Sequence, residues 1–153
     1  MSRRYPVRRY VGRVKRNAER HVRAGTSNVA ANTQRIAYTY VAPQAGTVKS
    51  IKLDIGNGGG LSNDTIVPYA LVVVREGYNA NLLVYPALSD DLYNPTMDVL
   101  VSGVLTDGSF EDHKWNKIGR KLKTGDRLCL IVYNTSSGTA TDVAFELSFS
   151  FMT

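Results

Sequence analysis

The chain has 153 residues, of which 43% are hydrophobic and 21% are charged, an ordinary composition for one globular domain and not for a wholly disordered chain. The net charge of +6 is unevenly spread: residues 1–24 hold nine Arg or Lys and one acid, and the other 129 hold ten basic and twelve acidic residues. A uniformly basic enzyme would not divide in this way. The pattern indicates a polycationic arm on a slightly acidic body, and nucleic acid is the commonest polyanion for such an arm.

The arm, which we place at residues 1–25, is predicted to neutralise phosphates by counterion release. Its aliphatic residues recur every three or four positions, a spacing that permits an amphipathic helix from about Val11 to Arg23, with Gly25 as its stop. Repulsion between like charges would keep the arm disordered until it meets a polyanion. Tyr5 and Tyr10 could stack on bases or be ordinary residues of a flexible tail. The predicted nucleic-acid-binding residues are Arg3, Arg4, Tyr5, Arg8, Arg9, Tyr10, Arg13, Lys15, Arg16, Arg20 and Arg23.

Residues 26–32 are small and polar and are predicted to be a linker, and residues 33–153 read as strands and turns. Alternating side chains predict strands over 35–40, 51–55 and 143–151, and apolar runs predict strands over 67–74, 97–105 and 127–133. Turn signals such as Asn57-Gly58 and Asp107-Gly108 separate these runs. We therefore predict an all-β domain, a single antiparallel jelly-roll β-sandwich of about eight strands.

The body offers no plausible catalytic or metal-binding constellation, so we expect no enzymatic activity and no cofactor or metal. The single Cys129 lies in an apolar run and is predicted to be a buried strand residue. In the segment Glu111-Asp112-His113 a strand would point Asp112 away from its neighbours, so a polar loop leading into a strand is the preferred interpretation over a metal site. Asp90 and Asp91 could bind a hard cation, but solvated loop acids are favoured. We expect no membrane partner, because no run reaches the ~18 apolar residues of a membrane span and no apolar segment follows the N-terminal charges.

A second basic cluster lies in the body around the only tryptophan. It could be a second nucleic-acid surface on which the Trp ring stacks on a base, or a solvated face whose Trp belongs to the core, and the sequence leaves both open. Its residues are Lys114, Trp115, Lys117, Arg120, Lys121 and Lys123.

The basic arm, polar linker and compact jelly roll resemble the coat proteins of small icosahedral viruses. Two local patterns are similar to capsid proteins of circular, Rep-encoding single-stranded DNA (CRESS-DNA) viruses. They are Leu92-Tyr93-Asn94-Pro95 running into Asp98-Val99-Leu100, and Asp112-His113-Lys114 followed by Gly119-Arg120-Lys121-Leu122 and Gly125-Asp126-Arg127-Leu128. The resemblance implies a self-assembling capsid protein that packages single-stranded nucleic acid, with DNA favoured, and that resides in the virion.

The body is shorter than most such capsid domains, which suggests the smallest closed shell, T=1 with sixty copies. Sixty arms at +8 would neutralise on the order of 500 phosphates. If the host is eukaryotic, the arm could also direct the protein to the nucleus for assembly. The alternative is a non-viral nucleic-acid-binding β-barrel module with a basic tail, although the body of such a module would usually be basic too. A carbohydrate-binding or other ligand-binding sandwich would leave the arm unexplained.

Overall fold

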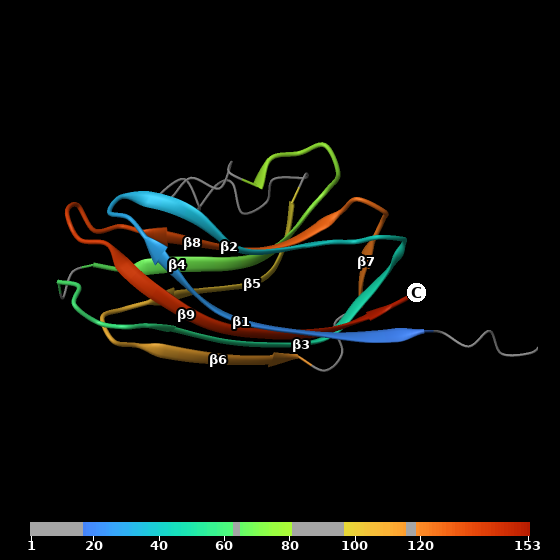
Figure 1. Ribbon diagram of the computed structural model, residues 1–153, viewed down its shortest axis with the longest axis horizontal. Helices are drawn as coiled ribbons and strands as arrows, with labels where there is room; N and C mark the ends of the chain where they lie inside the picture. Colours follow the sequence, from blue (N-terminus) through green and yellow to red (C-terminus); the bar gives the residue numbers. More distant parts are fainter. Residues whose placement is uncertain (1–16, 63–64, 81–96, 116–118) are drawn as a thin grey trace, which may run out of the picture.

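The computed structural model describes residues 17–62, 65–80, 97–115 and 119–153, which form nine β-strands (Figure 1). The strands are β1 (Ala18–Val29), β2 (Thr33–Val41), β3 (Gly46–Asn57), β4 (Val67–Val74), β5 (Met97–Leu105), β6 (Phe110–Trp115), β7 (Arg120–Leu122), β8 (Arg127–Asn134) and β9 (Thr141–Met152). Within the described ranges the structure has no helix with the length and apolar character needed to cross a membrane.

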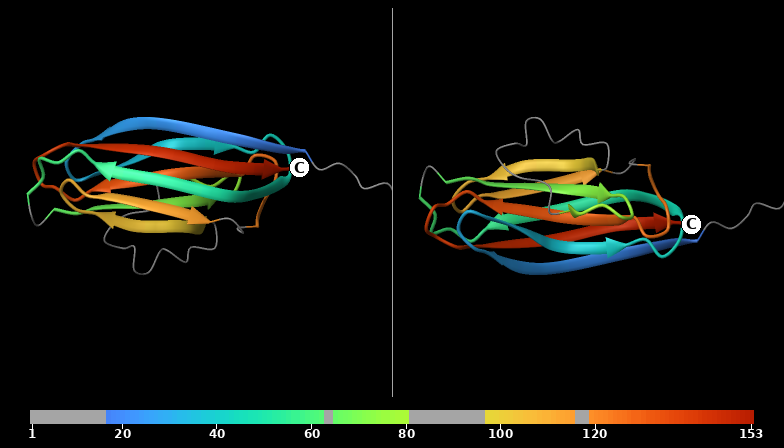
Figure 2. Two further views of the ribbon diagram at one scale, coloured as in Figure 1. Left: turned by 90° about the horizontal axis from the view of Figure 1, so that it is seen from below. Right: turned by 90° about the horizontal axis from the view of Figure 1, so that it is seen from above.

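The strands form two sheets packed face to face, as the views in Figure 2 show. Sheet A has the order β1-β9-β3-β6, with the short β7 paired to the beginning of β3, and sheet B has the order β2-β8-β4-β5. All strand pairs are antiparallel, and the chain crosses repeatedly from one sheet to the other. This interleaved order is that of a jelly roll, so the predicted jelly-roll β-sandwich is confirmed.

The core lies between the two sheets and follows the alternation seen in the sequence. The inward residues of β9, from Val143 to Phe151 in steps of two, are at most 7% exposed. Each large apolar side chain fully buried here stabilises the fold by roughly 1.5–3 kcal/mol. The predicted buried position of Cys129 is also confirmed, since it packs with Val72 and Ile131 in a smaller cluster on the other face of sheet B. Burial raises the pKa of its thiol.

Strand β1 corrects the sequence-based division of the chain. A helix over residues 11–23 would place Arg16, Arg20 and Arg23 on one face, where like charges repel. In β1, Arg20 and Arg23 project to opposite faces, and the backbone from Ala18 to Val29 pairs with β9 throughout. The predicted helix is therefore wrong for residues 18–23, and the predicted linker is wrong for residues 26–29. The sandwich begins at Ala18 and not at residue 33.

Two further local expectations change for physical reasons. Gly25 does not stop a helix: a Cβ at this position would lie 3.3 Å from the ring of Phe145, so the missing side chain lets that ring pack against β1. The polar loop expected at residues 111–113 is part of strand β6, which pairs with β3. The exposed edge position of β6 tolerates polar residues on both of its faces, and this obscured the strand in the sequence.

Candidate nucleic-acid interface

Only Arg20 and Arg23 of the predicted arm residues are described by the structure. Arg20 lies on the outer face of sheet A, where its Nη2 donates a hydrogen bond to Oγ of Ser148 at 3.4 Å. Arg23 lies on the inner side of the same strand, where its positive charge partly offsets the burial that raises the pKa of Tyr38. The two arginines therefore serve different surfaces. The remaining predicted arm residues, Arg3, Arg4, Tyr5, Arg8, Arg9, Tyr10, Arg13, Lys15 and Arg16, lie outside the described residues.

The strand register brings cations from four strands together on the outer face of sheet A. In one row across the sheet, Arg20 lies opposite Ser150, which lies opposite Lys49. In the next row, Ser148 lies opposite Lys52, and Lys52 lies opposite Lys114 of β6. Lys121 of β7 lies on the same face, toward the end of the sandwich from which the arm leaves. We call this set the basic band: Arg20, Lys49, Lys52, Lys114 and Lys121.

The middle of the basic band is a shallow polar floor. Ser148 and Ser150 of β9 carry short side chains between the longer cations of β1 on one side and of β3 and β6 on the other. Among the described residues, Lys49, Lys114 and Lys121 form no ion pair within 4.0 Å. The band therefore combines uncompensated positive charge with the partly exposed hydroxyl of Ser150, and both kinds of group bind phosphate oxygens.

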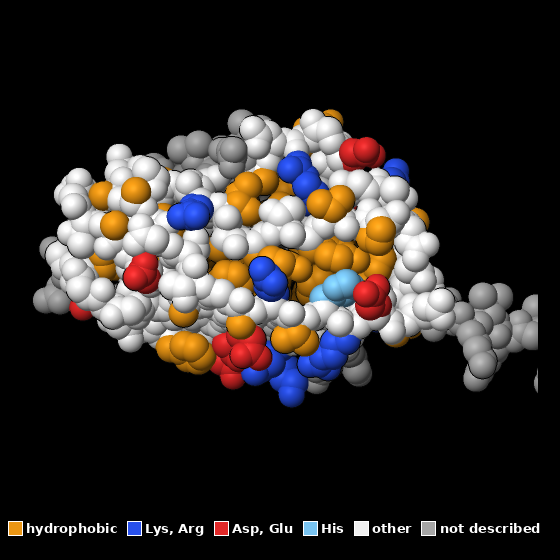
Figure 3. Space-filling view, in the orientation of Figure 1, with side chains coloured by type: hydrophobic (Ala, Val, Ile, Leu, Met, Phe, Trp, Pro, Cys, Tyr) orange, Lys and Arg blue, Asp and Glu red, His pale blue; other side chains and the backbone are white. Residues whose placement is uncertain are grey.

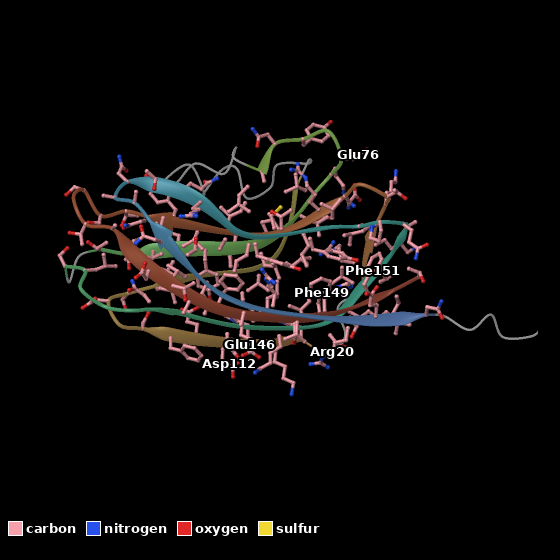
Figure 4. All side chains as sticks on the ribbon, viewed as in Figure 1. Arg20, Glu76, Asp112, Glu146, Phe149 and Phe151 are labelled. Carbon is pink, nitrogen blue, oxygen red and sulfur yellow. The ribbon has the colours of Figure 1, made fainter. Side chains whose placement is uncertain are left out.

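A row of three acids borders the basic band on the side away from the arm. Glu146 lies opposite Asp54, which lies opposite Asp112, on the same outer face. Figure 4 labels Glu146 and Asp112 near Arg20 along the lower margin, and Figure 3 shows the acidic and basic groups there as neighbours. We call these residues the acidic row. The charge on this face is therefore divided into two halves.

Ionisation within the acidic row is uneven. Lys52 Nζ lies 2.7 Å from Asp54 Oδ2, and this hydrogen bond lowers the pKa of Asp54. A hydrogen bond to Asp54 raises the pKa of Asp112, because the proton that Asp112 carries is shared with its neighbour. Apart from that proton, the buried Asp54 Oδ1 has no hydrogen-bond partner. As the pH falls, Asp112 therefore takes up a proton before Asp54 does.

The predicted second surface around Trp115 is divided by the fold. Lys114 and Lys121 lie in the basic band, but Trp115 faces inward, packs against the core and stacks on His113 with ring centroids 5.2 Å apart. Arg120 also turns away, toward Asp98 of β5 at 3.8 Å. Trp115 therefore does not share a face with Lys114, and its partly buried ring packs against the core. Lys123 is exposed beside the groove described next, and Lys117 lies outside the described residues.

A groove of about 1070 Å³ opens at the end of the sandwich from which the arm leaves. It shares Lys49 and Lys121 with the basic band, and Lys123 also lines it. The backbone N–H of Thr153 donates to the carbonyl of Asn17 at 3.0 Å, which fixes the C-terminus beside the start of β1. The groove, the basic band and the root of the arm therefore lie at one end of the molecule.

A buried carboxylate holds the wall of this groove. Asp126 is 2% exposed and accepts hydrogen bonds from the backbone N–H groups of Lys123, at 2.8 Å, and Glu76, at 3.1 Å. Arg75 links Asp126 to Asp98. Its Nη1 lies 2.8 Å from Asp126 Oδ2, and its Nη2 lies 2.9 Å from Asp98 Oδ2. Burial alone would raise the pKa of Asp126, but these donors outweigh it and the pKa is lowered.

The other polar cluster lies between the sheets. Tyr69 of β4 hydrogen-bonds both Glu111 and His113 of β6, and His113 Nε2 lies 3.1 Å from Glu111 Oε2. Glu111 and His113 point inward while Asp112 points outward, as predicted for a strand. No group of three or more His, Cys, Asp or Glu in the described ranges is placed to hold a metal. Asp90 and Asp91 lie outside those ranges.

No protein-family model and no curated protein matches this chain. Among solved structures, it is similar to a Bacillus endospore appendage described as a disulfide-linked pilus, with a TM-score of 0.46, 11% identity, and 90% of this chain and 89% of the other covered. It is similar to the BFDV capsid protein, with a TM-score of 0.43, 10% identity, and 91% and 100% covered. It is also similar to a structure of infectious bursal disease virus, Gx strain, with a TM-score of 0.45, 7% identity, and 90% and 32% covered. These likenesses are too weak to argue for a function.

Proposed function

We propose that this chain is the structural protein of a small icosahedral capsid, in which the jelly roll forms the shell and the N-terminal arm binds single-stranded nucleic acid. The observation that carries the proposal is the division of charge. Residues 1–24 carry a net charge of +8 and the rest a net charge of −2, and the cations of the arm continue onto one face of the sandwich through Arg20. A polycationic segment fixed at one end of a β-sandwich can condense nucleic acid on one side of a wall built from many copies.

The proposal is tested on the purified full chain by measuring particle mass, imaging the particles and recording the ratio of absorbance at 260 and 280 nm. We expect closed shells of about sixty copies that contain nuclease-protected nucleic acid. A protein that stays monomeric under all assembly conditions contradicts the capsid function. If that monomer binds nucleic acid, a binding module with a basic tail becomes the better account.

We propose DNA as the cargo because of the sequence resemblance to CRESS-DNA capsid proteins, since Arg and Lys contacts to phosphate do not distinguish DNA from RNA. Digestion of the extracted cargo with DNase or with RNase decides this point. We also propose that the arm acts as a nuclear import signal in a eukaryotic host. A reporter fused to residues 1–24 that remains cytoplasmic would remove that part of the proposal.

A further inference from the structure

The outer face of sheet A carries the basic band on one part and the acidic row on the adjoining part. Neighbouring strands lie about 4.8 Å apart, so the basic band spans roughly 14 Å from β1 to β6. Its rows are separated by about 6.7 Å, the distance between alternate residues of a strand. The acidic row lies one such step beyond the row of Lys52 and Lys114. This step is shorter than the screening length of about 8 Å at physiological salt, so the acids repel a phosphate that moves from the band toward them.

We propose that the basic band is a second binding surface for the backbone of the same nucleic acid that the arm binds, and that sheet A therefore faces the inside of the shell. This inference rests on the proposed function and adds to it a direction for the wall. The partner is a polyanion with several charges, because the cations of the band come from four different strands and are spread across the sheet.

Two contacts prepare the band for this role. The hydrogen bond to Ser148 holds the Arg20 guanidinium over the serine floor, toward the lysines of β3 and β6. The groove at the arm end shares Lys49 and Lys121 with the band, so positive charge continues from the band to the position where residue 17 leaves the sheet. One nucleic-acid strand can therefore contact the arm, the groove and the band without crossing the acidic row.

The test uses the full chain with Lys49→Ala and Lys114→Ala combined, because neither lysine forms an ion pair among the described residues. The matched control removes two positive charges from sheet B by Arg35→Gln and Arg127→Gln. The measurement is the affinity for a single-stranded DNA oligonucleotide as a function of salt. For single strands the logarithmic slope is about −0.7 for each phosphate neutralised. The lysine variant loses two cations, so we expect the magnitude of its logarithmic salt slope to fall by about 1.4. The control should keep the slope of the unaltered chain.

A second variant acts in the opposite direction. Replacing the exposed acids by Glu146→Gln and Asp112→Asn removes the repulsive border, so we expect tighter oligonucleotide binding and a steeper salt slope. Thermal unfolding of each variant checks that the fold is retained. Because these substitutions remove negative charge and add no positive charge, tighter binding would report the loss of repulsion.

Three results would overturn the inference. If the unaltered chain assembles and binds DNA but the lysine variant keeps its slope, the band does not bind nucleic acid, although the proposed function stands. If the lysine variant keeps its slope and loses self-association without nucleic acid, the band is a contact between copies, for which the acidic row of a neighbouring copy is the complementary surface. If the unaltered chain neither assembles nor binds, the proposed function fails together with the inference.

Discussion

Asp126 fixes the end of the sandwich from which the arm leaves. Its carboxylate accepts two backbone N–H groups and the Arg75 guanidinium, and through them it connects the end of β4, the β7–β8 turn and β5. A buried carboxylate with so many donors stabilises the fold only while it is ionised, because a protonated Asp loses the attraction of Arg75. The shape of the groove thus depends on the charge state of one residue.

The lowered pKa of Asp126 predicts an acid-sensitive contribution to stability. A depressed folded-state pKa means that this stabilisation is present above the usual carboxyl pKa and is lost as the pH falls through the folded value. We expect Asp126→Asn to reduce the free energy of unfolding by about 1–3 kcal/mol at neutral pH. Between about pH 5 and about pH 3, the unaltered protein should lose more stability than the variant does.

Denaturant unfolding at several pH values checks this prediction, with the exposed Asp142→Asn as the matched control. The exposed side chain of Asp142 accepts a hydrogen bond from Asn28, so the control should change stability by less than about 0.5 kcal/mol. Equal effects of the two substitutions would contradict the role given to Asp126.

Gly46 provides a prediction about packing. A Cβ at this position would lie 2.5 Å from the ring of Phe151 and 2.7 Å from the backbone oxygen of Met152, so the backbone of β9 would have to move. We expect Gly46→Ala to destabilise the fold by about 1–3 kcal/mol, as overpacking does in other cores. Gly138→Ala is the control, because a Cβ there meets nothing within 4 Å. Thermal unfolding that ranks the two variants equally would contradict this packing argument.

At the scale of elements, β1 joins the arm to the β-sandwich, and its strand geometry separates two arginines that a helix would have placed together. Arg20 lies in the basic band, whereas Arg23 lies on the inner side near Tyr38. The conformation of this segment thus decides which arginine meets the outer face of sheet A.

This separation predicts unequal effects on nucleic-acid binding. We expect Arg20→Gln to reduce the magnitude of the salt slope for single-stranded DNA by about 0.7, which corresponds to one phosphate. Arg23→Gln has the same charge change and serves as its control, and it should leave the slope nearly unchanged. Equal losses from the two variants would mean that this segment meets nucleic acid in a different conformation.

The strands predicted from alternation or from valine-rich runs all appear in the structure, because in those stretches the core face dictates the residue types. This holds for 143–151 in β9 and 67–74 in β4. Strands β1, β6 and β7 were not predicted, because they lie at the edge of sheet A and much of their length carries exposed polar residues. Their conformation comes from pairing with β9 and β3, which no local pattern reports.

The candidate site could be predicted only in part for the same reason. The sequence indicated Arg20, Lys114 and Lys121 as basic residues in separate segments. It gave no signal for Lys49 and Lys52 of β3, which join the band only through the register with β9 and β6. The acidic row was likewise invisible, because Asp54, Asp112 and Glu146 are far apart in the chain and meet only across paired strands.

At the scale of the whole molecule, the basic band lies on the half of the outer face of sheet A nearest the arm, whereas other cations, such as Arg35 and Arg127, belong to sheet B. The arm leaves beside the C-terminus, where Thr153 pairs with Asn17, and the basic band begins on the adjoining part of sheet A. A shell built from such units would carry the arms and the basic bands on the same side of the wall. The structure also defines where the arm can be removed: deletion of residues 1–24 would cut into β1, whereas deletion of residues 1–16 leaves all nine strands intact.

The most direct test of the central claim is the amount of nuclease-protected nucleic acid per particle, measured for the full chain and for residues 17–153 prepared in the same way. We expect particles of the full chain to protect nucleic acid. The shortened chain should keep its fold and protect far less, because seven of the nine cations of residues 1–24 are removed with residues 1–16. Equal protection by the two proteins, or no particles from the full chain, would contradict the account.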